Sequence, residues 1–389
     1  MTGSTARLRS LRGQAAEWAG EFRAHGTPLD SDPDAIGTML SLGGVQYLAT
    51  AGVPECFGGR DLRVDGHRFD GMPVLERVLV IEELACGDAG LMLGSPGPSM
   101  SGVLVEQLAD EDQKARFYGQ LVAEPTWTFF ALTEREHGSD ATAIESAVSD
   151  RGKGSLELTG SKCYVGNAAR ARIGTVFART GGGPLGIGSF LVDPTSPGFR
   201  AEPLETEGLR GAQICEIVME GVPLTDGDVL GRHLPRTRRG MWASIQVFNR
   251  LRPGVAAIAV GIARAAHEYV RAEWRRPPGS AADTIGALGD AIAATRSVVR
   301  QAALTVDHGG DGYLASAAKG RACALAEEVT LAVCDLLGPG ARLEHPLLDK
   351  LVRDGRGVEF MEGTRNIQAL QTFQGLLTGK LDSAPSDAR

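Results

Sequence analysis

The chain has 389 residues and a formal net charge of −8. An acidic chain of this length argues against nonspecific nucleic-acid binding, which requires a positive field, and it is long enough for two or three domains. Hydrophobic residues make up 43% of the chain and charged residues 23%, as is typical of a soluble globular protein. No run of about 18 apolar residues predicts a membrane span, and the N-terminus lacks the apolar segment of a secretory signal. We therefore expect a cytoplasmic protein without membrane contact.

The cysteines and histidines show no spacing typical of a functional site. The six cysteines share no CxxC pattern, which favours reduced structural thiols, and they are Cys56, Cys86, Cys163, Cys215, Cys323 and Cys334. The seven histidines lack metal-ligand spacing. No metal site is expected.

Residues 1–123 are predicted to form a helical domain. In "PVLERVLVIEELACGDAG" (73–90) apolar residues recur every three or four positions, as in a helix that faces a core. "LADEDQKARFYGQL" (108–121) opens with acidic residues, which suit a helix N-terminus. "GVPECFGGRDLR" (52–63) is predicted to be a glycine-rich loop.

Residues 124–235 are predicted to form a β domain. The region contains short segments that are rich in β-branched or aromatic residues and separated by Gly, Asp and Pro. These segments are "WTFFALTE" (127–134), "SLELTGSKCYV" (155–165), "IGTVFART" (173–180), "GIGSFLVD" (186–193) and "ICEIVMEGVPL" (214–224). Their spacing suits a small barrel or sandwich.

Residues 236–389 are predicted to form a helical bundle. Long Ala-rich helical patterns occupy 252–274 and 314–338, and "RRPPGSAADT" (275–284) separates two helices. The order helices, strands, helices defines an α+β fold. Neither βαβ units nor a GxGxxG pattern is present, which disfavours a dinucleotide-binding sheet domain.

Several motifs resemble those of the acyl-CoA dehydrogenase flavoproteins. They occur in the family's order, as "FFALTEREHGSDATA" (129–143), "LTGSKCYVGNAARA" (158–171), "GLRGAQICEIVMEGVPLTDGDVLG" (208–231) and "LVRDGRGVEFMEGTRNIQ" (351–368). The resemblance implies an N-terminal helical domain, a middle β domain and a C-terminal four-helix bundle. It further implies FAD as cofactor, a homodimer or homotetramer, and α,β-dehydrogenation of an acyl-CoA or acyl-carrier-protein thioester, with a flavoprotein as electron acceptor.

The stretch "VEFMEGTRNIQ" (358–368) contains the candidate catalytic residue. Abstracting the weakly acidic α-proton of a thioester requires a positioned base, and burial raises the pKa of a carboxylate. By resemblance Glu362 is that base, whereas its alternative is an ordinary helix-surface carboxylate. Gly363 is expected beside the substrate, where glycine permits a tight turn. Some relatives carry the base just before the residue equivalent to Arg252, where this chain has Leu251; Arg252 is either a supporting partner of the site or part of an interhelical ion pair.

The resemblance also assigns cofactor contacts along the chain. These are Phe130, Leu132, Thr133, Gly138, Ser139, Tyr164, Gly166, Gly338, Thr364 and Asn366. The alternatives are a strand followed by a plain turn for the residues up to Ser139, and a core aromatic for Tyr164.

Two further groups of residues are assigned to the substrate. Leu91, Met92, Leu93 and Pro96 are expected to line an aliphatic acyl pocket, or else to be plain core. The segment "GRHLPRTRRG" (231–240) contains Arg236, Arg238 and Arg239, which either contact the CoA phosphates or an acidic carrier protein, or form a solvated linker.

Three positions depart from the family pattern. Gly166 replaces the hydroxyl residue that meets flavin N5, Glu273 replaces an Arg that reaches a neighbouring subunit's FAD, and Asp335 replaces a Gln near the adenine. Nearby Arg271, Arg275 or Arg276 are alternatives for the missing Arg. These departures keep open a flavin-dependent oxidase or monooxygenase, and a non-catalytic acyl-binding protein.

Overall fold

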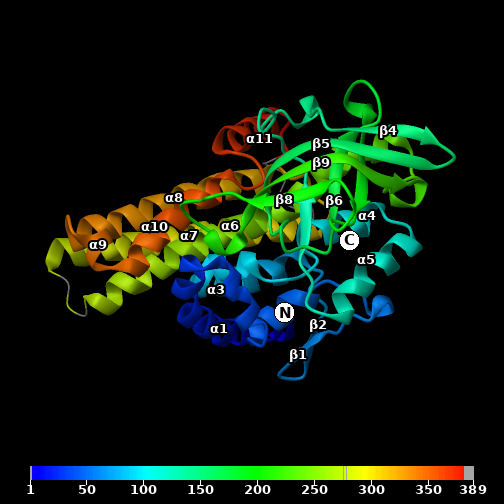
Figure 1. Ribbon diagram of the computed structural model, residues 1–389. Helices are drawn as coiled ribbons and strands as arrows, with labels where there is room; N and C mark the ends of the chain where they lie inside the picture. Colours follow the sequence, from blue (N-terminus) through cyan, green and yellow to red (C-terminus); the bar gives the residue numbers. More distant parts are fainter. Residues whose placement is uncertain (1, 275, 277, 381–389) are drawn as a thin grey trace.

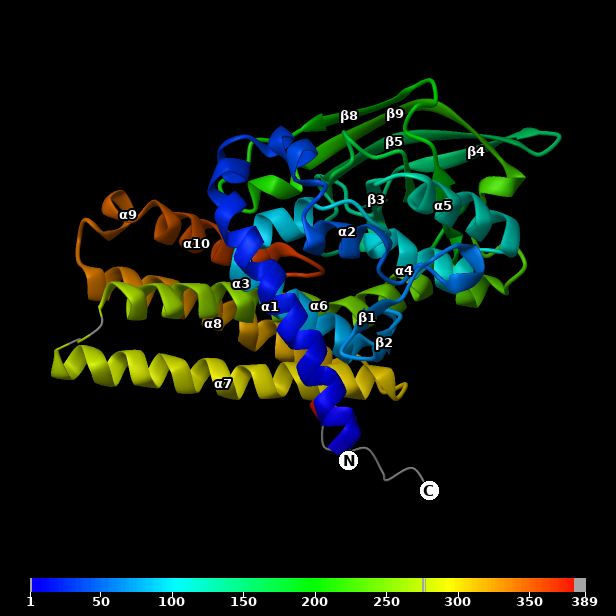
Figure 2. The ribbon, with the colours of Figure 1, turned by 90° about the horizontal axis from the view of Figure 1, so that it is seen from below.

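The computed structural model describes residues 2–274, 276 and 278–380. Figure 1 shows the strands gathered at one end of the molecule and the long C-terminal helices extending away from them. Figure 2, seen from below, shows the N-terminal helix α1 running diagonally across these long helices. The predicted α+β order of helices, sheet and helices is confirmed.

The helices of the first part of the chain are α1 (Thr2–Ser31), α2 (Gly43–Thr50), α3 (Val74–Gly94), α4 (Ser99–Leu108) and α5 (Glu111–Ala123). Those after the sheet are α6 (Gly240–Glu273), α7 (Gly279–Asp307), α8 (Tyr313–Leu337), α9 (Ala341–Glu344), α10 (Pro346–Gly357) and α11 (Arg365–Leu377). Helix α5 begins with the predicted acidic turn, where Asp110 and Gln113 form a reciprocal capping box. The bundle has a core of small buried residues, many of them alanines of α6 and α8.

The strands of the middle region form one seven-stranded sheet in the order β3-β6-β4-β5-β9-β8, with β7 paired to β6. They are β3 (Thr128–Ala131), β4 (Ala147–Gly152), β5 (Ser155–Gly166), β6 (Ile173–Arg179), β7 (Ile187–Val192), β8 (Phe199–Pro203) and β9 (Ile214–Thr225). Strands β3 and β6 run parallel, and β5 pairs antiparallel with β9. Each of the five predicted strand segments contains a strand.

Two features of the chain differ from the sequence prediction. Strands β4 and β8 were missed because neither contains a run of buried apolar residues: β4 has no buried residue and β8 has only Phe199, so they lack the apolar signal of the other strands. The predicted loop at 52–63 runs into a short hairpin of β1 (Leu62–Val64) and β2 (His67–Phe69). The domain boundaries at 123 and 235 remain predictions.

A buried cluster of charged groups joins three parts of the chain. Asp88 has extended backbone angles and interrupts α3. Its carboxylate lies 2.7 Å from Lys350 Nζ, which lies 2.6 Å from Asp354 on the same helix, α10. Asp354 also accepts a hydrogen bond from the Leu209 N–H at 2.6 Å, just before the 3-10 helix η5 (Arg210–Ala212). This cluster fixes α10, the helix that leads to Glu362, against α3 and the β domain.

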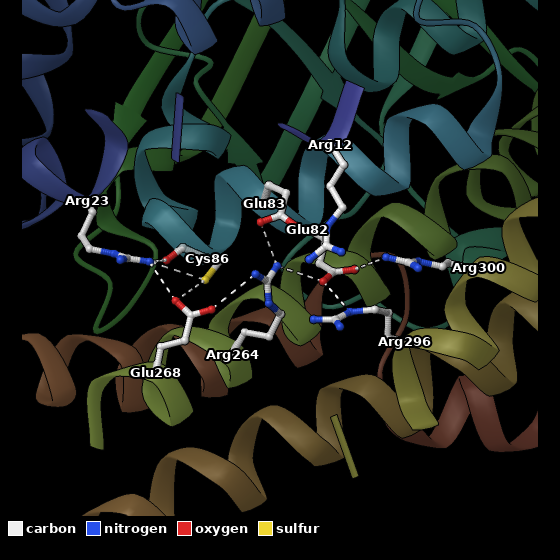
Figure 3. Close-up of polar contacts among 9 residues, drawn as sticks. All are labelled: Arg12, Arg23, Glu82, Glu83, Cys86, Arg264, Glu268, Arg296 and Arg300. Atoms are coloured by element: carbon white, nitrogen blue, oxygen red, sulfur yellow. Dashed lines mark hydrogen bonds and ion pairs between the residues drawn. The ribbon is translucent and has the colours of Figure 1, made fainter. Parts of the chain in front are cut away.

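A second ionic network joins the N-terminal helices to the bundle (Figure 3). Glu82 and Glu83 of α3 are buried. Arg264 of α6 forms ion pairs with both, at 2.9 Å to Glu82 and 3.0 Å to Glu83. Arg296 of α7 also pairs with Glu82 at 2.7 Å, and Arg12 of α1 also pairs with Glu83 at 2.6 Å. Because two carboxylates are shared among guanidinium groups of three helices, removing one partner leaves a buried charge and is strongly destabilising.

Candidate active site

The candidate base lies in a strained turn between two helical segments. Helix α10 continues into a short 3-10 helix, η8 (Val358–Phe360), and α11 begins at Arg365. Between them Glu362 has φ 52° and Gly363 has φ 99°. A left-handed conformation costs a non-glycine residue about 1–2 kcal/mol. At Gly363 a Cβ atom would lie 3.0 Å from the Gln368 side-chain nitrogen, so both backbone and space favour glycine.

The Glu362 carboxylate lies in a dry, cationic environment. The residue as a whole is half-buried, but its Oε2 atom is out of contact with solvent and accepts no hydrogen bond within the described chain. Burial raises the pKa of Glu362 to about 7, although Lys319, Arg252 and Arg77 act in the opposite direction. A carboxyl group with this pKa can gain or release a proton near neutral pH, which suits a general base.

Two of the cations around Glu362, Lys319 and Arg252, donate to main-chain carbonyl groups and not to the carboxylate. The Glu362 carbonyl accepts from Gln368 Nε2 at 3.1 Å and from Arg252 Nε at 3.4 Å. Lys319 of α8 donates to the carbonyl groups of Glu359 and Gly363. The turn is therefore fixed from three helices, α6, α8 and α11.

Arg252 supports this turn and forms no ion pair within the described residues. It is 3% exposed, and its Nη1 atom donates to Asn249, Ser316 and Gln371 oxygens at 3.1, 3.3 and 2.5 Å. Of the two sequence-based alternatives, the geometry therefore matches the supporting partner. Leu251 is partly buried and packs on a neighbouring hydrophobic cluster.

The segment after β3 is held against β5 by a buried ion pair. Glu134 lies 2.8 Å from Lys162, and its carboxylate also accepts from Ser146 and from the Glu145 N–H. Burial by itself raises the pKa of Glu134, but the bonds from Lys162 and Ser146 bring it down to about 2. Burial lowers the pKa of Lys162 to about 8, since desolvation outweighs the partner charge. Both groups are charged at pH 7, because 7 lies between the two values.

The predicted flavin contacts on the β domain fall into two groups. Thr133 and Tyr164 lie close together, because the Thr133 carbonyl accepts from the Cys163 N–H at 2.9 Å. Tyr164 has φ 62° and its side chain is 61% exposed, which excludes the alternative of a core aromatic. Gly138 and Ser139 lie on the exposed loop that follows.

Phe130 and Leu132 are directed into the interior. The Phe130 ring packs 5.2 Å from that of Phe177 and 6.1 Å from that of Phe248. Leu132 is 4% exposed, and its carbonyl accepts from Lys162. The Phe130 side chain is thus partly buried and the Leu132 side chain is buried by packing. Mainly the backbone of residues 130–133 is left for contact with a ligand.

Gly166, at the end of β5, has room for a side chain. A Cβ atom there would meet only Ala212 and Ile214 atoms at 3.7 and 3.9 Å, which is ordinary contact. The next residue, Asn167, donates to the Leu93 carbonyl at 2.9 Å, while its own Oδ1 atom is buried and has no hydrogen-bond partner among the residues that the structure describes. Strand β5 and the end of α3 therefore meet here.

The predicted acyl-pocket residues are mostly enclosed. Leu91 is fully buried and Met92 is 8% exposed, and both belong to the main hydrophobic core. Leu93 is half-buried and Pro96 is buried. Leu93 contacts the predicted β domain through its carbonyl group, which accepts from Asn167, and the assignment of all four residues to a pocket stays a prediction.

The remaining predicted cofactor residues lie in two separate places in the chain, at the start of α11 and after the end of α8. Thr364 is the N-cap of α11 and its side chain makes no capping bond, and Asn366 is exposed on the first turn of that helix. Gly338 follows the far end of α8. It is 19 residues beyond Lys319, which corresponds to about 28 Å along a helix. Gly338 therefore lies far from Glu362 in the same chain.

The two adenosine-side departures are also found at that far end. Asp335 lies in the last turn of α8 and Glu273 is the last residue of α6, and both are exposed. Arg271 and Arg276 are exposed as well, whereas Arg275 lies outside the described residues.

The arginine-rich segment before α6 has mixed roles. Arg239 donates to the carbonyl groups of Arg232 and Leu234 and so holds the segment's own backbone. By contrast, Arg236 and Arg238 are exposed and form no ion pair within the described chain, although Arg238 lies over the Trp242 ring. Of the three predicted residues, Arg236 and Arg238 remain available to a ligand.

Sequence reasoning missed four residues of this region. Lys319 and Gln368 hold the turn at Glu362, and the pair Glu134–Lys162 fixes the segment at Thr133. A lysine inside the otherwise apolar pattern of "LASAAKGRACALA" was an available signal, because a buried lysine requires acceptors. The sequence itself gives no indication of which acceptors they are.

Comparisons with known proteins agree with this architecture. The acyl-CoA dehydrogenase middle domain matches residues 129–222, and the acyl-CoA dehydrogenase C-terminal domain matches residues 238–377. The short-chain specific acyl-CoA dehydrogenase of Megasphaera elsdenii is 29% identical over 360 residues, which cover 89% of this chain and 90% of that protein. The chain belongs to the acyl-CoA dehydrogenase family, whose members are oxidoreductases acting on CH–CH donors.

Solved structures show the same fold. Butyryl-CoA dehydrogenase from Megasphaera elsdenii superimposes with a TM-score of 0.82 at 27% identity, covering 94% of this chain and 98% of that chain. The prolyl acyl carrier protein oxidase AnaB superimposes with a TM-score of 0.81 at 19% identity, covering 95% and 98%. The latter likeness concerns the fold alone. No helix in the part of the chain that the structure describes has the length and apolar character needed to cross a membrane.

Proposed function

We propose that the protein is an FAD-dependent dehydrogenase that introduces an α,β double bond into an acyl thioester, with Glu362 as the base that removes the α-proton. The observation that carries the proposal is the Glu362 carboxylate. Its Oε2 atom is buried and unpartnered, and its pKa is raised to about 7. A structural carboxylate in this position would be expected to pair with one of the nearby cations.

The surrounding groups favour proton transfer at this oxygen. Because Lys319 and Arg252 donate to main-chain carbonyl groups, their hydrogen bonds do not compete for the carboxylate. Their charges still oppose protonation. The base is therefore desolvated enough to accept a proton from carbon, while enough of it stays ionised near pH 7 to react.

The main chain of the same turn can stabilise the developing enolate oxygen. The Glu362 N–H donates to no group in the described chain. Since the turn holds Glu362 at φ 52°, this N–H and the carboxylate belong to one fixed unit. A backbone N–H that is pre-positioned toward a thioester carbonyl costs no reorganisation during the reaction.

The residues present fit a flavin. Tyr164 offers a large exposed ring beside the Thr133 backbone, and aromatic rings pack well on planar ligands. The Thr364 side chain is uncommitted at the N-terminus of the 13-residue helix α11, where backbone N–H groups favour anions. When bound, FAD supplies the two-electron oxidation by which the β-hydrogen leaves as hydride. Among the predicted contacts, Tyr164, Thr133 and Thr364 would hold it.

Exposed side chains support our proposals for the thioester carrier and for the oligomeric state. Arg236 and Arg238 lack ion-pair partners within the described residues and suit the phosphates of CoA or an acidic carrier protein. Exposed apolar side chains on α11, a typical sign of an interface, support a homodimer or homotetramer. These side chains are Leu370, Phe373, Leu376 and Leu377. A flavoprotein is the electron acceptor we expect.

The test is anaerobic flavin reduction. The FAD-loaded protein is mixed with acyl-CoA and acyl-carrier-protein thioesters of different chain length, and bleaching of the flavin absorbance is recorded. We expect bleaching by one short or medium acyl thioester and at least a thousandfold slower bleaching in Glu362→Gln. Glu327→Gln, which removes a carboxylate paired with Arg356 and Arg365, is the matched control and should bleach normally. Undiminished bleaching in Glu362→Gln would exclude the assigned base.

A second candidate function is a flavin-dependent oxidase or monooxygenase. It is favoured by Gly166, where the family's hydroxyl is replaced although the structure has room for a side chain. Hydrogen peroxide release in air, at the rate of substrate oxidation, would select the oxidase.

A further inference from the structure

Lys319 lies directly behind the turn that carries the base. It is in the second turn of α8 and is 1% exposed. Its ammonium group donates to the Glu359 carbonyl at 2.7 Å and to the Gly363 carbonyl. These two acceptors lie three residues before and one residue after Glu362. One side chain thus spans the turn from both sides.

The turn needs such support because its backbone is strained. Glu362 and Gly363 both have positive φ, and a non-glycine residue keeps such a conformation only where its surroundings determine it. The other donors, Arg252 and Gln368, bind the Glu362 carbonyl, and Gln368 also binds that of Gly363. Of these three donors, Lys319 alone also donates to a carbonyl group of the preceding 3-10 helix, η8.

The hydrogen bonds and the charge of Lys319 therefore act on different groups of the turn. Its N–H groups bind carbonyl oxygens, while its positive charge acts on a carboxylate that it does not touch. The charged groups that face Glu362 are Lys319 on α8, Arg252 on α6 and Arg77 on α3, with Lys319 the strongest of the three. Lys319 in turn faces Cys323, Glu359 and Arg252, and burial lowers its own pKa.

We propose that Lys319 is a positioning residue of the reaction, which clamps the main chain on both sides of Glu362 and, through its charge, keeps the carboxylate in the proton-accepting form. This role rests on the proposed function of Glu362. It assigns two separable tasks to one side chain. The clamp fixes where the carboxylate lies, and the charge sets the pH at which it reacts.

Two substitutions separate the tasks. Lys319→Met keeps a chain of similar length but removes both the donors and the charge, whereas Lys319→Gln removes the charge and keeps amide N–H donors on a side chain that is one bond shorter. Val333→Ala is the matched control, because Val333 is fully buried on the same helix about 14 residues further along. It should lose stability without touching the turn.

The first measurement is the pH dependence of kcat/KM, whose acid limb reports the base of the free enzyme. Without the Lys319 charge, desolvation of Glu362 is less opposed. We expect the acid limb to move up by about one pH unit in both Lys319 variants, and to stay in place in Val333→Ala.

The second measurement does not depend on turnover. Amide hydrogen exchange of the FAD-loaded, substrate-free protein is followed for peptides that cover residues 358–366. We expect exchange at least tenfold faster in Lys319→Met, and near the wild-type rate in Lys319→Gln and Val333→Ala. If Lys319→Met does not fold, the acid limb of Lys319→Gln alone decides the role of the charge.

The outcomes distinguish this inference from the proposed function. An inactive Glu362→Gln together with an unmoved acid limb in both Lys319 variants overturns the role of Lys319 and leaves the base assignment intact. Wild-type bleaching by Glu362→Gln removes the base itself. A uniform loss of stability in all variants, with no movement of the limb and no local change in exchange, makes Lys319 a core residue only.

Discussion

Glu362→Gln should stabilise the protein at alkaline pH, although it abolishes the proposed activity. The pKa of Glu362 is about 7 in the folded chain against an ordinary value of 4.5. A raised carboxyl pKa means that the folded state binds the proton more tightly than the unfolded state. The stabilising contribution of the protonated form is complete below pH 4.5, and it is lost as the pH rises to 7.

The size of the effect follows from the difference in pKa. The difference between a pKa of about 7 and the ordinary value of 4.5, at about 1.36 kcal/mol for each tenfold change in proton affinity, gives about 3 kcal/mol of destabilisation by ionised Glu362 above pH 7. Glutamine has the same shape and no charge to bury. With an unfolding entropy of about 0.8 kcal/mol/K for a chain of this size, the variant should melt about 4 °C higher than the wild type at pH 8.

The assay is thermal unfolding of both proteins, loaded with FAD and free of substrate, at pH 4.5 and at pH 8. The comparison at pH 4.5 is an internal control, because Glu362 is protonated there in the folded state and about half protonated in the unfolded state, so that most of the difference is removed and the melting temperatures should agree within about 1 °C. A Gln variant that melts at or below the wild-type temperature at pH 8 would mean that the carboxylate is not desolvated. The assignment of a dry base would then be wrong.

Three further predictions concern other parts of the site. Glu134→Gln should lower stability at pH 7 by about 3 kcal/mol, and its deficit should shrink as the pH falls from 4.5 to 2, because the depressed pKa of Glu134 makes its contribution one that acid removes; a deficit that does not change with pH in thermal melts contradicts this. Gly166→Ser should melt within about 1 °C of the wild type, because the structure has room for its Cβ, and should slow the reoxidation of reduced flavin in air; an unchanged reoxidation rate argues against contact with the flavin. Charge reversal of Arg236 and Arg238 should raise the KM for one thioester carrier at least tenfold with little change in the maximal bleaching rate; equal KM values for CoA and carrier-protein substrates before and after the change would return these residues to a solvated linker.

Elements with strong periodic signals were predictable from the sequence. Helix α3 and strands β3, β5, β6, β7 and β9 have one or both faces buried, so their apolar residues recur at the helical or strand period. Strands β4 and β8 have few buried side chains, and their pairing with β5 and β9 comes from backbone hydrogen bonds that leave little trace in residue type. The parallel pairing of β3 with β6 was likewise invisible, since the two segments are separated by more than 40 residues.

The candidate site shows the same division. The sequence predicted Glu362, Gly363 and Tyr164 as site residues, because the segments that contain them resemble motifs of the family. Only the tertiary structure assigned Lys319 and Gln368 to the turn. Their acceptors are main-chain carbonyl groups. Because every residue has such a group, the residue types in the sequence do not indicate these contacts. The proposal of Glu362 as the base depends on a buried oxygen that has no hydrogen-bond partner among the described residues. Three helices pack around this oxygen, and that arrangement exists only in the folded chain.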